Sequence, residues 1–443
     1  MSERIILDPL KLSPEEKRLK EFFEQRMIGQ PRVIDRIVFS YGHYLASLKL
    51  KWKRSKPIIC FILLGPTGVG KTLTAELLAE YFFGDPTSFT KIIAENFLEK
   101  HELSTLLGSS AGYVGFYNPK DPEHAGPPML HQSMIDRFAI EHFENTVLKK
   151  DDTVGRLHWE LEQYKKKANE AMSQGDKAVF QANLQSFLNT QERLNAYIET
   201  KRRDEKFLSV ILVDEIEKGP WEITNHLLHQ SSDKGMTVLK NGEITDFTNS
   251  WIIATSNLGS KAIAAKIRGS QMGFAPPSQL DQSIFDVAME EVERYFTPEF
   301  LARVMEDVVV CKPLEHDKLR AILDMRIAEL RTNFAQTFPI ELIIHDDVKK
   351  FIFAKAFKHP EFGARPLKSK LKKYLEEPLS RLITSDQVHV ADRVYVDKIV
   401  EFGKEKIIFT IDPAPTSILV QLADIEQSDE SKADDGKKDA DIA

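Results

Sequence analysis

The stretch Phe61-Ile62-Leu63-Leu64-Gly65-Pro66-Thr67-Gly68-Val69-Gly70-Lys71-Thr72 decides the fold of this chain of 443 residues. An apolar run of strand length leads into the pattern Gly-x-x-x-x-Gly-Lys-Thr, and residues 73–81 follow with the spacing of a helix. A phosphate-binding loop requires this order of strand, loop and helix. Its backbone N–H groups would surround a β-phosphate, Lys71 would reach the β- and γ-phosphates, and the Thr72 hydroxyl would hold Mg²⁺. We therefore predict an α/β nucleotide-binding domain.

The composition narrows the class of protein further. The net charge of −7 leaves no basic excess for nucleic acid. Cys60 and Cys311, the two cysteines, stand far apart in apolar runs without metal-ligand spacing, which favours buried thiols in a reducing compartment. The first residues are charged and lack a signal-peptide core, and the longest apolar run, 58–64, is too short to span a bilayer. We expect a soluble, cytoplasmic protein that binds neither nucleic acid nor membranes.

Two further strands are predicted to end in polar side chains. Residues 208–213 are apolar throughout, as in a strand buried on both faces, and Asp214 and Glu215 follow. Beside a phosphate-binding loop, this pair predicts a carboxylate that holds Mg²⁺ through water, Asp214, and a base that activates the attacking water, Glu215. A polar cap on the strand is the alternative. Asn257 follows the strand 251–255 and would orient the water, or merely cap the next helix.

Residues 151–203 differ in composition from the rest, with few β-branched side chains and many Lys, Glu, Gln, Ala and Asn. Apolar side chains recur at heptad spacing, with Gln191 in one slot and a turn at 173–176; they are Leu157, Leu161, Tyr164, Ala168 and Ala171, then Phe180, Leu184, Phe187, Leu194 and Ile198. Two such helices predict an inserted antiparallel coiled-coil hairpin over 150–204, with arms of about 30 Å. Helices lying flat on their own domain are the alternative.

An aromatic residue between glycines, Tyr113 in Gly112-Tyr113-Val114-Gly115, is unsuited to a strand interior. We predict a mobile loop that presents this tyrosine; a hairpin turn with a packed tyrosine is the alternative. Residues 313–412 alternate helical stretches with short strands and predict a small, mostly helical C-terminal subdomain, leaving 1–312 as the large subdomain. Residues 413–443 form a predicted disordered tail, in which 424–443 carry −5 of the net charge.

With these motifs in order, the chain resembles the Clp family of AAA+ protein unfoldases, in particular the second ATPase module of ClpA, ClpB and ClpC. The resemblance covers about residues 15–145 and 207–412. The matching motifs are Met27-Ile28-Gly29-Gln30, the loop 65–72, Glu99-Lys100-His101, Gly112–Gly115, Val213-Asp214-Glu215-Ile216-Glu217-Lys218, Thr255-Ser256-Asn257-Leu258-Gly259, Phe296-Thr297-Pro298-Glu299-Phe300-Leu301-Ala302-Arg303 and Phe362-Gly363-Ala364-Arg365-Pro366-Leu367.

The resemblance implies an AAA+ ATPase that uses ATP and Mg²⁺, with Ile28 among the nucleotide contacts. Asn257 resembles sensor 1, and Arg365 resembles the sensor 2 arginine that reads the γ-phosphate. Arg303 resembles an arginine finger donated to the neighbouring subunit's site, which requires a ring, in this family a homo-hexamer. A surface ion pair is the alternative for each arginine. Tyr113 resembles the pore-loop aromatic that grips a translocating polypeptide, and residues 235–247 match the region of a second pore loop.

Partners are also implied by the resemblance. Met272-Gly273-Phe274 falls where ClpA and ClpC carry a tripeptide that docks on the ClpP peptidase, although a loop tucking Phe274 into the core would look the same. The chain departs from the family at Ala302, where Asn is usual, and near Met305, where Asp is usual. The hairpin is inserted at a place similar to the inserted domain of HslU. We expect the hairpin, the short N-terminus or a separate adaptor to select substrates.

The resulting hypothesis is an ATP-dependent protein unfoldase or remodelling chaperone that threads polypeptide through a ring and feeds, in one version, a ClpP-type peptidase. The alternative is a regulatory or scaffolding ATPase whose nucleotide state controls a dedicated complex through the coiled-coil arm. A nucleic-acid motor is disfavoured by the acidic balance.

Overall fold

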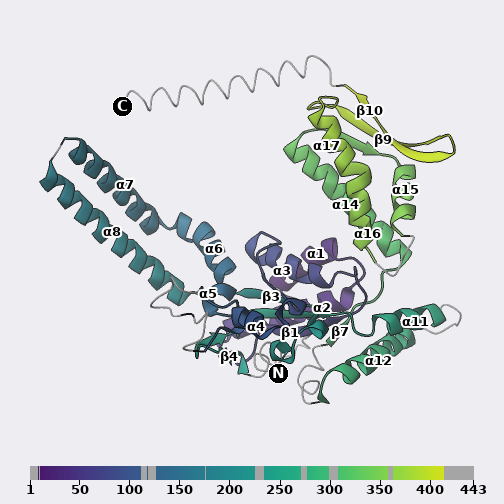
Figure 1. Cartoon of the computed structure of the whole chain (residues 1–443), viewed down its shortest axis with the longest axis horizontal. Coiled ribbons are helices and arrows are strands. Elements are labelled where there is room, and N and C mark those ends of the chain that lie inside the picture. Colours follow the sequence, from purple (N-terminus) through teal and green to yellow (C-terminus); the bar gives the residue numbers. More distant parts are fainter. Residues whose placement is uncertain are drawn as a thin grey trace, which may run out of the picture. The chain divides into compact units, whose positions relative to one another are not determined.

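The computed structural model describes residues 8, 10–110, 117, 126–174, 176–224, 234–270, 277–298, 308–357 and 363–413 (Figure 1). The chain divides into two compact units. The first consists of Met1–Gly65 and Gly70–Cys311, and the second of Pro66–Val69 and Lys312–Ala443. No helix of the described part is long and apolar enough to cross a membrane.

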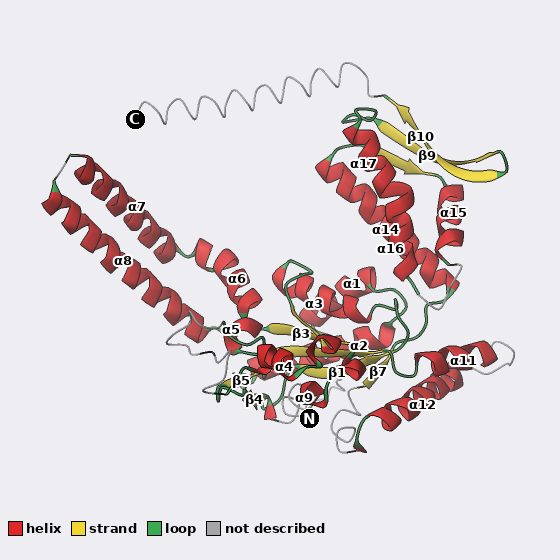
Figure 2. Ribbon diagram, viewed as in Figure 1, coloured by secondary structure: helices red, strands yellow, loops and turns green. Residues whose placement is uncertain are grey.

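A five-stranded parallel sheet in the order β2-β3-β6-β1-β7 forms the centre of the first unit. Its strands, drawn in yellow between helices in Figure 2, are β1 (Ile59–Leu64), β2 (Thr90–Ile93), β3 (Ser209–Asp214), β6 (Ser250–Ser256) and β7 (Val308–Val310). Because β1 and β6 pair from Ile59↔Trp251 to Leu64↔Ser256, the carboxyl ends of neighbouring strands meet at one edge. In open α/β sheets, ligands bind at this edge.

The central strands are apolar because both of their faces are covered. Every residue of β1 and β6 is buried, and so are the first five residues of β3. On one face, side chains of α4 and α12 share a buried cluster with Ile62 and Leu64 of β1. The helix α3 contacts β3 and β6. The prediction of an α/β fold with a parallel sheet flanked by helices is confirmed.

Apart from two long helices described below, the other elements of the first unit precede β1 or connect the strands of the sheet. They are α1 (Pro14–Arg26), α2 (Pro31–Lys49), α3 (Lys71–Phe83), η1 (Ala94–Phe97), α4 (Lys100–Leu107), α5 (Gln132–Ile135), α6 (Arg137–Thr146), η2 (Leu148–Lys150), η3 (Ile216–Lys218), α9 (Trp221–Ile223), β4 (Met236–Val238), β5 (Ile244–Asp246), α11 (Ser260–Ser270) and α12 (Pro277–Tyr295). The helix α1 starts at the predicted place, because Ser13 and Glu16 form a reciprocal capping box. The strands β4 and β5, within the predicted second pore-loop region, pair as an antiparallel hairpin.

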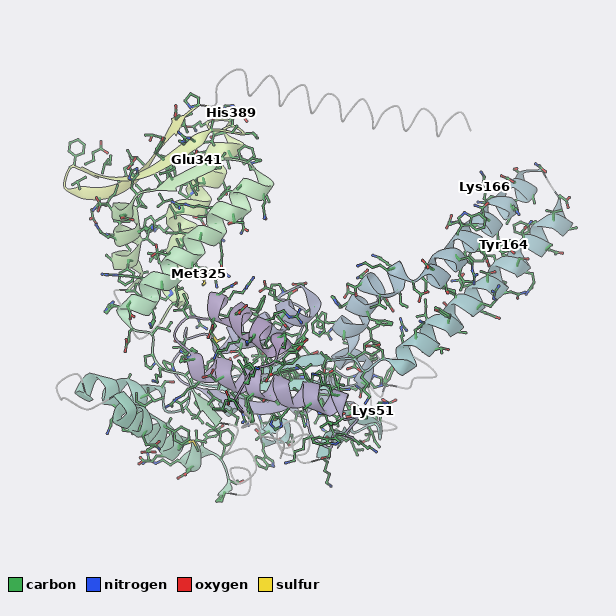
Figure 3. The ribbon with its side chains drawn as sticks, turned by 180° about the vertical axis from the view of Figure 1, so that it is seen from behind. Lys51, Tyr164, Lys166, Met325, Glu341 and His389 are labelled. Carbon is green, nitrogen blue, oxygen red and sulfur yellow. The ribbon has the colours of Figure 1, made fainter. Side chains whose placement is uncertain are left out.

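The inserted segment forms two long helices, α7 (Asp152–Ser173) and α8 (Lys177–Asp204), which pack on each other. Asp151 and Asp176 cap their N-termini by accepting hydrogen bonds from two backbone N–H groups each. Of the α7 heptad positions, Leu157, Leu161, Ala168 and Ala171 are buried. Tyr164, which Figure 3 labels on α7, is half-buried.

The register of α8 differs from the heptad prediction in its outer half. Thr190, 4% exposed, takes the place in the seam that was predicted for Gln191, and Leu184 is 42% exposed. Neighbouring helix positions point about 100° apart, so a shift of one residue moves a side chain out of the seam. Leu194 is buried as predicted. It belongs to a cluster with Phe143 of α6, which joins α6 to the half of the α7–α8 pair farther from the turn at 173–176.

The second unit has its own core and a three-stranded sheet in the order β10-β9-β8. Its elements are α14 (His316–Thr337), β8 (Glu341–Ile344), α15 (Asp346–Ala356), α16 (Arg365–Leu371), η7 (Lys372–Glu376), α17 (Glu377–Thr384), β9 (Arg393–Glu401) and β10 (Lys404–Asp412). The stretch 364–382, predicted as one helix, is interrupted by a π-helical turn, η7. The predicted tail lies outside the described residues from 414 onward.

Candidate active site

The phosphate-binding loop joins β1 to α3 through two glycines with positive φ. Gly65 has φ +143°, and a Cβ there would lie 2.5 Å from the carbonyl oxygen of Cys311, so only glycine fits. Gly70, with φ +105°, is the N-cap of α3, which therefore begins at Lys71. This arrangement aims the positive end of the helix dipole at the loop.

The Lys71 side chain is buried and extends back along the loop. Its Nζ donates to the carbonyl oxygen of Gly65 at 2.6 Å and to Asn257 Oδ1 at 3.0 Å. Thr72, the next residue of α3, is half-buried. Lys71, Thr72 and the glycines at positions 65 and 70 thus lie directly after β1, and their role in holding phosphates stays a prediction.

The tip of the loop, Pro66–Val69, belongs to the second unit. Within that unit, the Ala364 N–H donates to the Gly68 carbonyl oxygen at 3.0 Å. Gly363 has φ +56°, and a Cβ there would lie 2.7 Å from the same oxygen, so this approach also requires glycine. Arg365, the predicted sensor 2 arginine, is the first residue of α16, and its side chain is exposed.

Two carboxylates stand at the end of β3, as predicted. Asp214 Oδ1 accepts a hydrogen bond from Thr255 Oγ1 at 2.5 Å, and Oδ2 lies 3.5 Å from Lys91 Nζ. The Glu215 N–H donates to the same Thr255 Oγ1 at 3.1 Å. Glu215 adopts φ +54°, a left-handed conformation that is uncommon outside glycine and frequent at functional sites.

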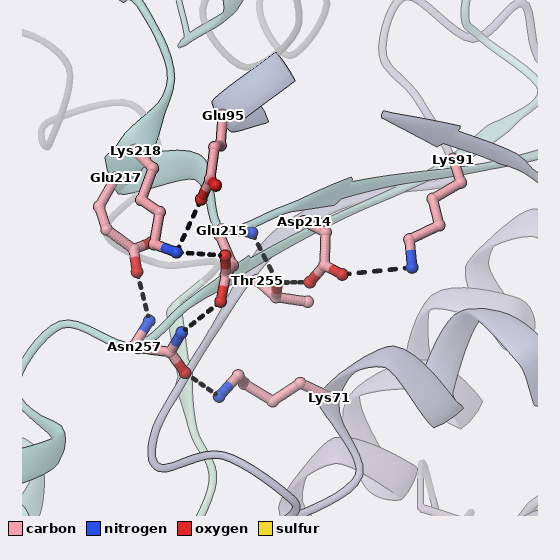
Figure 4. A network of polar contacts seen from close by, with 9 residues as sticks. All are labelled: Lys71, Lys91, Glu95, Asp214, Glu215, Glu217, Lys218, Thr255 and Asn257. Atoms are coloured by element: carbon pink, nitrogen blue, oxygen red, sulfur yellow. Dashed lines mark hydrogen bonds and ion pairs between the residues drawn. The ribbon is translucent and has the colours of Figure 1, made fainter. Parts of the chain in front are cut away.

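The Glu215 carboxylate is contacted at both oxygens (Figure 4). Asn257 Nδ2 donates to Oε1 at 3.1 Å, and Lys218 Nζ lies 2.7 Å from Oε2. Since Asn257 Oδ1 also accepts from Lys71, the one amide joins the phosphate-loop lysine to the carboxylate. The Asn257 N–H is fixed in turn by Glu217 Oε1 at 3.0 Å.

Oxygen donors at this edge fit Mg²⁺. The Thr72 hydroxyl and the Asp214 carboxylate are the hard ligands that this cation prefers, and Mg²⁺ takes one or two protein groups together with water and phosphate oxygens. No group of three or more His, Cys, Asp or Glu side chains that could hold a metal is found among the described residues. A site that shares its metal with nucleotide phosphates needs no such group.

Other predicted site residues are placed elsewhere or lie outside the described part. Ile28 is half-buried in the turn between α1 and α2. Arg303, the pore-loop segment Gly112–Gly115 and the docking tripeptide Met272–Phe274 lie outside the described residues.

Sequence reasoning gave no role to five side chains of this network: Thr255, Lys91, Lys218, Glu95 and Glu217. The pair Glu215 and Lys218 has the i, i+3 spacing at which opposite charges meet in a helical turn, so a signal for it was present. Lys91 comes next to Asp214, and Glu95 next to Lys218, only because β2 pairs with β3. Local spacing in the sequence does not reveal this pairing.

A cavity of about 690 Å³ lies at the opposite edge of the sheet, where Ser209 and Ser250 begin β3 and β6. Its wall includes Asp136 and Asp246. Burial, with repulsion from Asp246 as a smaller cause, raises the pKa of Asp136 to about 7, against a hydrogen bond from Gln132 that lowers it. This cavity is separate from the network around Lys71.

Comparisons with known proteins match both units. Residues 56–119 and 143–307 match the family model for the AAA domain (Cdc48 subfamily), and residues 314–396 match the C-terminal, D2-small domain, of ClpB protein. The ATP-dependent Clp protease ATP-binding subunit ClpC of Staphylococcus aureus (strain USA300) is 30% identical over 379 residues, which cover 86% of this chain and 36% of that protein. The ClpA homolog of Porphyra purpurea is 28% identical over 395 residues, 88% of this chain and 38% of that protein. The chain therefore spans little more than a third of the length of the curated relatives it matches.

Proposed function

The chain belongs to the AAA domain family and is a Clp AAA+ relative, as its motifs predicted, and from this premise we propose that it is an ATP-driven protein unfoldase or remodelling chaperone. The AAA domain and the Clp ATPase relatives indicate ATP hydrolysis. Relatives named as ATP-binding subunits of a protease support a role in handling polypeptides.

The contact that best supports the ATPase chemistry is the Asn257 amide between Lys71 and Glu215. Lys71 would contact the β- and γ-phosphates, and Thr72 and Asp214 would hold Mg²⁺, which neutralises charge on the phosphates when bound. Glu215 would accept the proton of the attacking water, and Asn257 would orient that water against the γ-phosphate. The side chain of Asn257 contacts both the residue proposed to bind phosphates, Lys71, and the proposed base, Glu215.

The mechanical part of the proposal rests on residues named by the resemblance. Arg303 would enter the neighbouring subunit's site in a homo-hexameric ring, Arg365 would respond to the γ-phosphate, and Tyr113 would pull polypeptide through the pore. Met272–Phe274 would dock a ClpP-type peptidase, and an adaptor would supply clients. A cytoplasmic location belongs to the same proposal.

Unfolding of a tagged fluorescent protein in the presence of ATP tests this function. The parent should extinguish the fluorescence, whereas Tyr113→Ala should hydrolyse ATP and leave the substrate folded. Tyr117→Ala is a neighbouring aromatic control that should retain unfolding. Equal unfolding by parent and Tyr113→Ala would reject threading by this loop, and light scattering of the ATP-bound protein should report a hexamer.

A second candidate function, a regulatory ATPase acting through the hairpin, is favoured by how α6 is attached. His142 Nδ1 of α6 lies 3.0 Å from the carbonyl oxygen of Phe83, the last residue of α3. Within the same turn of α6, Glu144 pairs with Arg202 of α8, and Phe143 makes an edge-on contact with Phe207. The helix that starts at Lys71 is thus linked to the hairpin through one short helix.

A pull-down with hairpin-deleted protein separates the two candidates. A regulatory role predicts that ATP-dependent capture of a dedicated partner is lost together with residues 152–204, while unfolding of the tagged substrate is never observed. An unfoldase predicts the unfolding described above in the intact chain.

A further inference from the structure

A single ammonium group bridges two carboxylates beside the hydrolysis site. Lys218 Nζ lies 2.7 Å from Glu215 Oε2 and 2.8 Å from Glu95 Oε2 (Figure 4). Lys218 ends η3, directly after β3, and Glu95 lies in η1, directly after β2. These two short helical turns are in contact, so the bridge joins neighbouring strand ends across the carboxyl edge of the sheet.

The bridge completes the restraint on the Glu215 side chain. The Glu215 backbone is held in its left-handed turn by the bond from its N–H to Thr255. Asn257 fixes Oε1, and Lys218 is the described group that contacts Oε2. An ammonium has three donors and no acceptor, so Lys218 can hold Oε2 and Glu95 together without rearranging. Without it, the single hydrogen bond from Asn257 to Oε1 would be left to restrain rotation about the last side-chain torsion.

We propose that Lys218 is a positioning residue for ATP hydrolysis, which fixes the carboxylate of Glu215 and is itself anchored by Glu95. The inference rests on the proposed role of Glu215 as the base. Small errors in the placement of a reacting group lower the rate strongly, whereas ground-state binding of a nucleotide that Lys218 does not contact should change little. In this proposal Glu95 holds Lys218 in place, and Lys218 holds the carboxylate of Glu215 in place.

This order also connects the base to the segment that precedes the predicted pore loop. After Glu95, η1 leads into α4, which ends at Leu107, a few residues before Gly112. A displacement of that segment would move Glu95 first and so change the salt bridge between Glu95 and Lys218. Lys218 would pass this change on to the carboxylate of Glu215.

Steady-state ATPase assays of Lys218→Met and Lys218→Arg test the proposal. Lys218→Met should lower kcat about 10- to 100-fold with KM for ATP within about twofold of the parent. Lys218→Arg should recover a large part of kcat, because a guanidinium can also donate to both carboxylates. Lys20→Met is the matched control: Lys20 likewise lies between two carboxylates, at 3.3 Å from Asp35 and 4.0 Å from Glu24, in α1. It should leave kcat unchanged.

Single-turnover rates in double variants decide whether Lys218 acts through Glu215. Adding Lys218→Met to Glu215→Gln should cause no further loss, and adding Glu95→Gln to Lys218→Met should cause none either. Unfolding temperatures of all variants should match the parent within about 2 °C, which excludes general destabilisation. A parental kcat in Lys218→Met, or an equal loss in both backgrounds, overturns the positioning role. Hydrolysis by Glu215→Gln at the parental rate would instead reject the base and the proposed chemistry.

Discussion

Lys71 Nζ lies 3.0 Å from Asn257 Oδ1, so the phosphate-loop lysine and the residue after β6 are in direct contact although 186 positions separate them. The other end of the same amide contacts Glu215. In the proposed chemistry, binding of phosphates by Lys71 and acceptance of the water proton by Glu215 would thereby be joined through one side chain.

Replacing that side chain should slow hydrolysis more than binding. We expect Asn257→Ala to lower kcat about 100- to 1,000-fold, the usual cost of removing one donor aimed at a reaction centre. The Kd for a fluorescent ATP analogue should change only a fewfold, since Lys71 keeps its bond to Gly65. Asn183→Ala, which removes an exposed amide on α8, should change neither quantity. Equal losses in kcat and in affinity would contradict a role in the hydrolysis step.

Glu215→Gln should separate ATP binding from turnover. The amide is nearly the shape of the carboxylate and can accept from Asn257, but it cannot take a proton from water. We expect a loss of about 10²- to 10⁴-fold in kcat, the contribution of a general base. Nucleotide affinity should remain near that of the parent. Glu217→Gln, whose carboxylate accepts from the Asn257 N–H, should cost less, because it acts one contact further away.

Gly65→Ala should destabilise the fold more than strain alone explains. Gly65 and Gly84 both have positive φ, a backbone conformation that costs an alanine on the order of 1–3 kcal/mol. The Cβ at position 65 would in addition meet the Cys311 backbone, whereas no atom of the described residues lies within 4 Å of the Cβ at position 84. Thermal unfolding should therefore place the midpoint of Gly65→Ala below that of Gly84→Ala. Equal midpoints would show that the loop moves away at no cost.

Asp136→Asn should change the pH dependence of stability. The folded-state pKa of Asp136 is raised to about 7 from its ordinary value of 3.8. The folded chain therefore binds this proton more tightly than the unfolded chain, and its stability falls as pH rises from about 4 to about 7. Asparagine removes that loss, so the midpoint of Asp136→Asn minus that of the parent should grow over this range and then level off.

The control for this pH effect is an exposed pair of the same geometry. Gln282 donates to Asp286 across one helical turn at 2.8 Å, as Gln132 donates to Asp136 at 2.7 Å. The midpoint difference of Asp286→Asn serves as the baseline, and the growth seen for Asp136→Asn between pH 4 and pH 7 should exceed it. A growth for Asp136→Asn no larger than this baseline would contradict the buried environment of Asp136.

Much of the fold was predictable because its signals are local. Strands buried on both faces are continuous apolar runs, and the loop 65–72 has a pattern that few chains carry by chance. The seam of α8 was predicted less well, since Thr190 and Gln191 are both polar and periodicity alone cannot choose between them. The contacts of Lys91 and Glu95 depend on which strands pair, and that choice is made by the whole core.

Both cysteines of the chain are buried, and burial raises the pKa of the Cys311 thiol to about 12, which keeps it protonated at neutral pH. Thiol-directed dyes should therefore react slowly with the parent protein. A single new cysteine in place of exposed Gln174, at the end of α7, could then carry a fluorophore without removal of the native thiols. The chain is in this respect ready for optical measurement of how its hairpin responds to nucleotide.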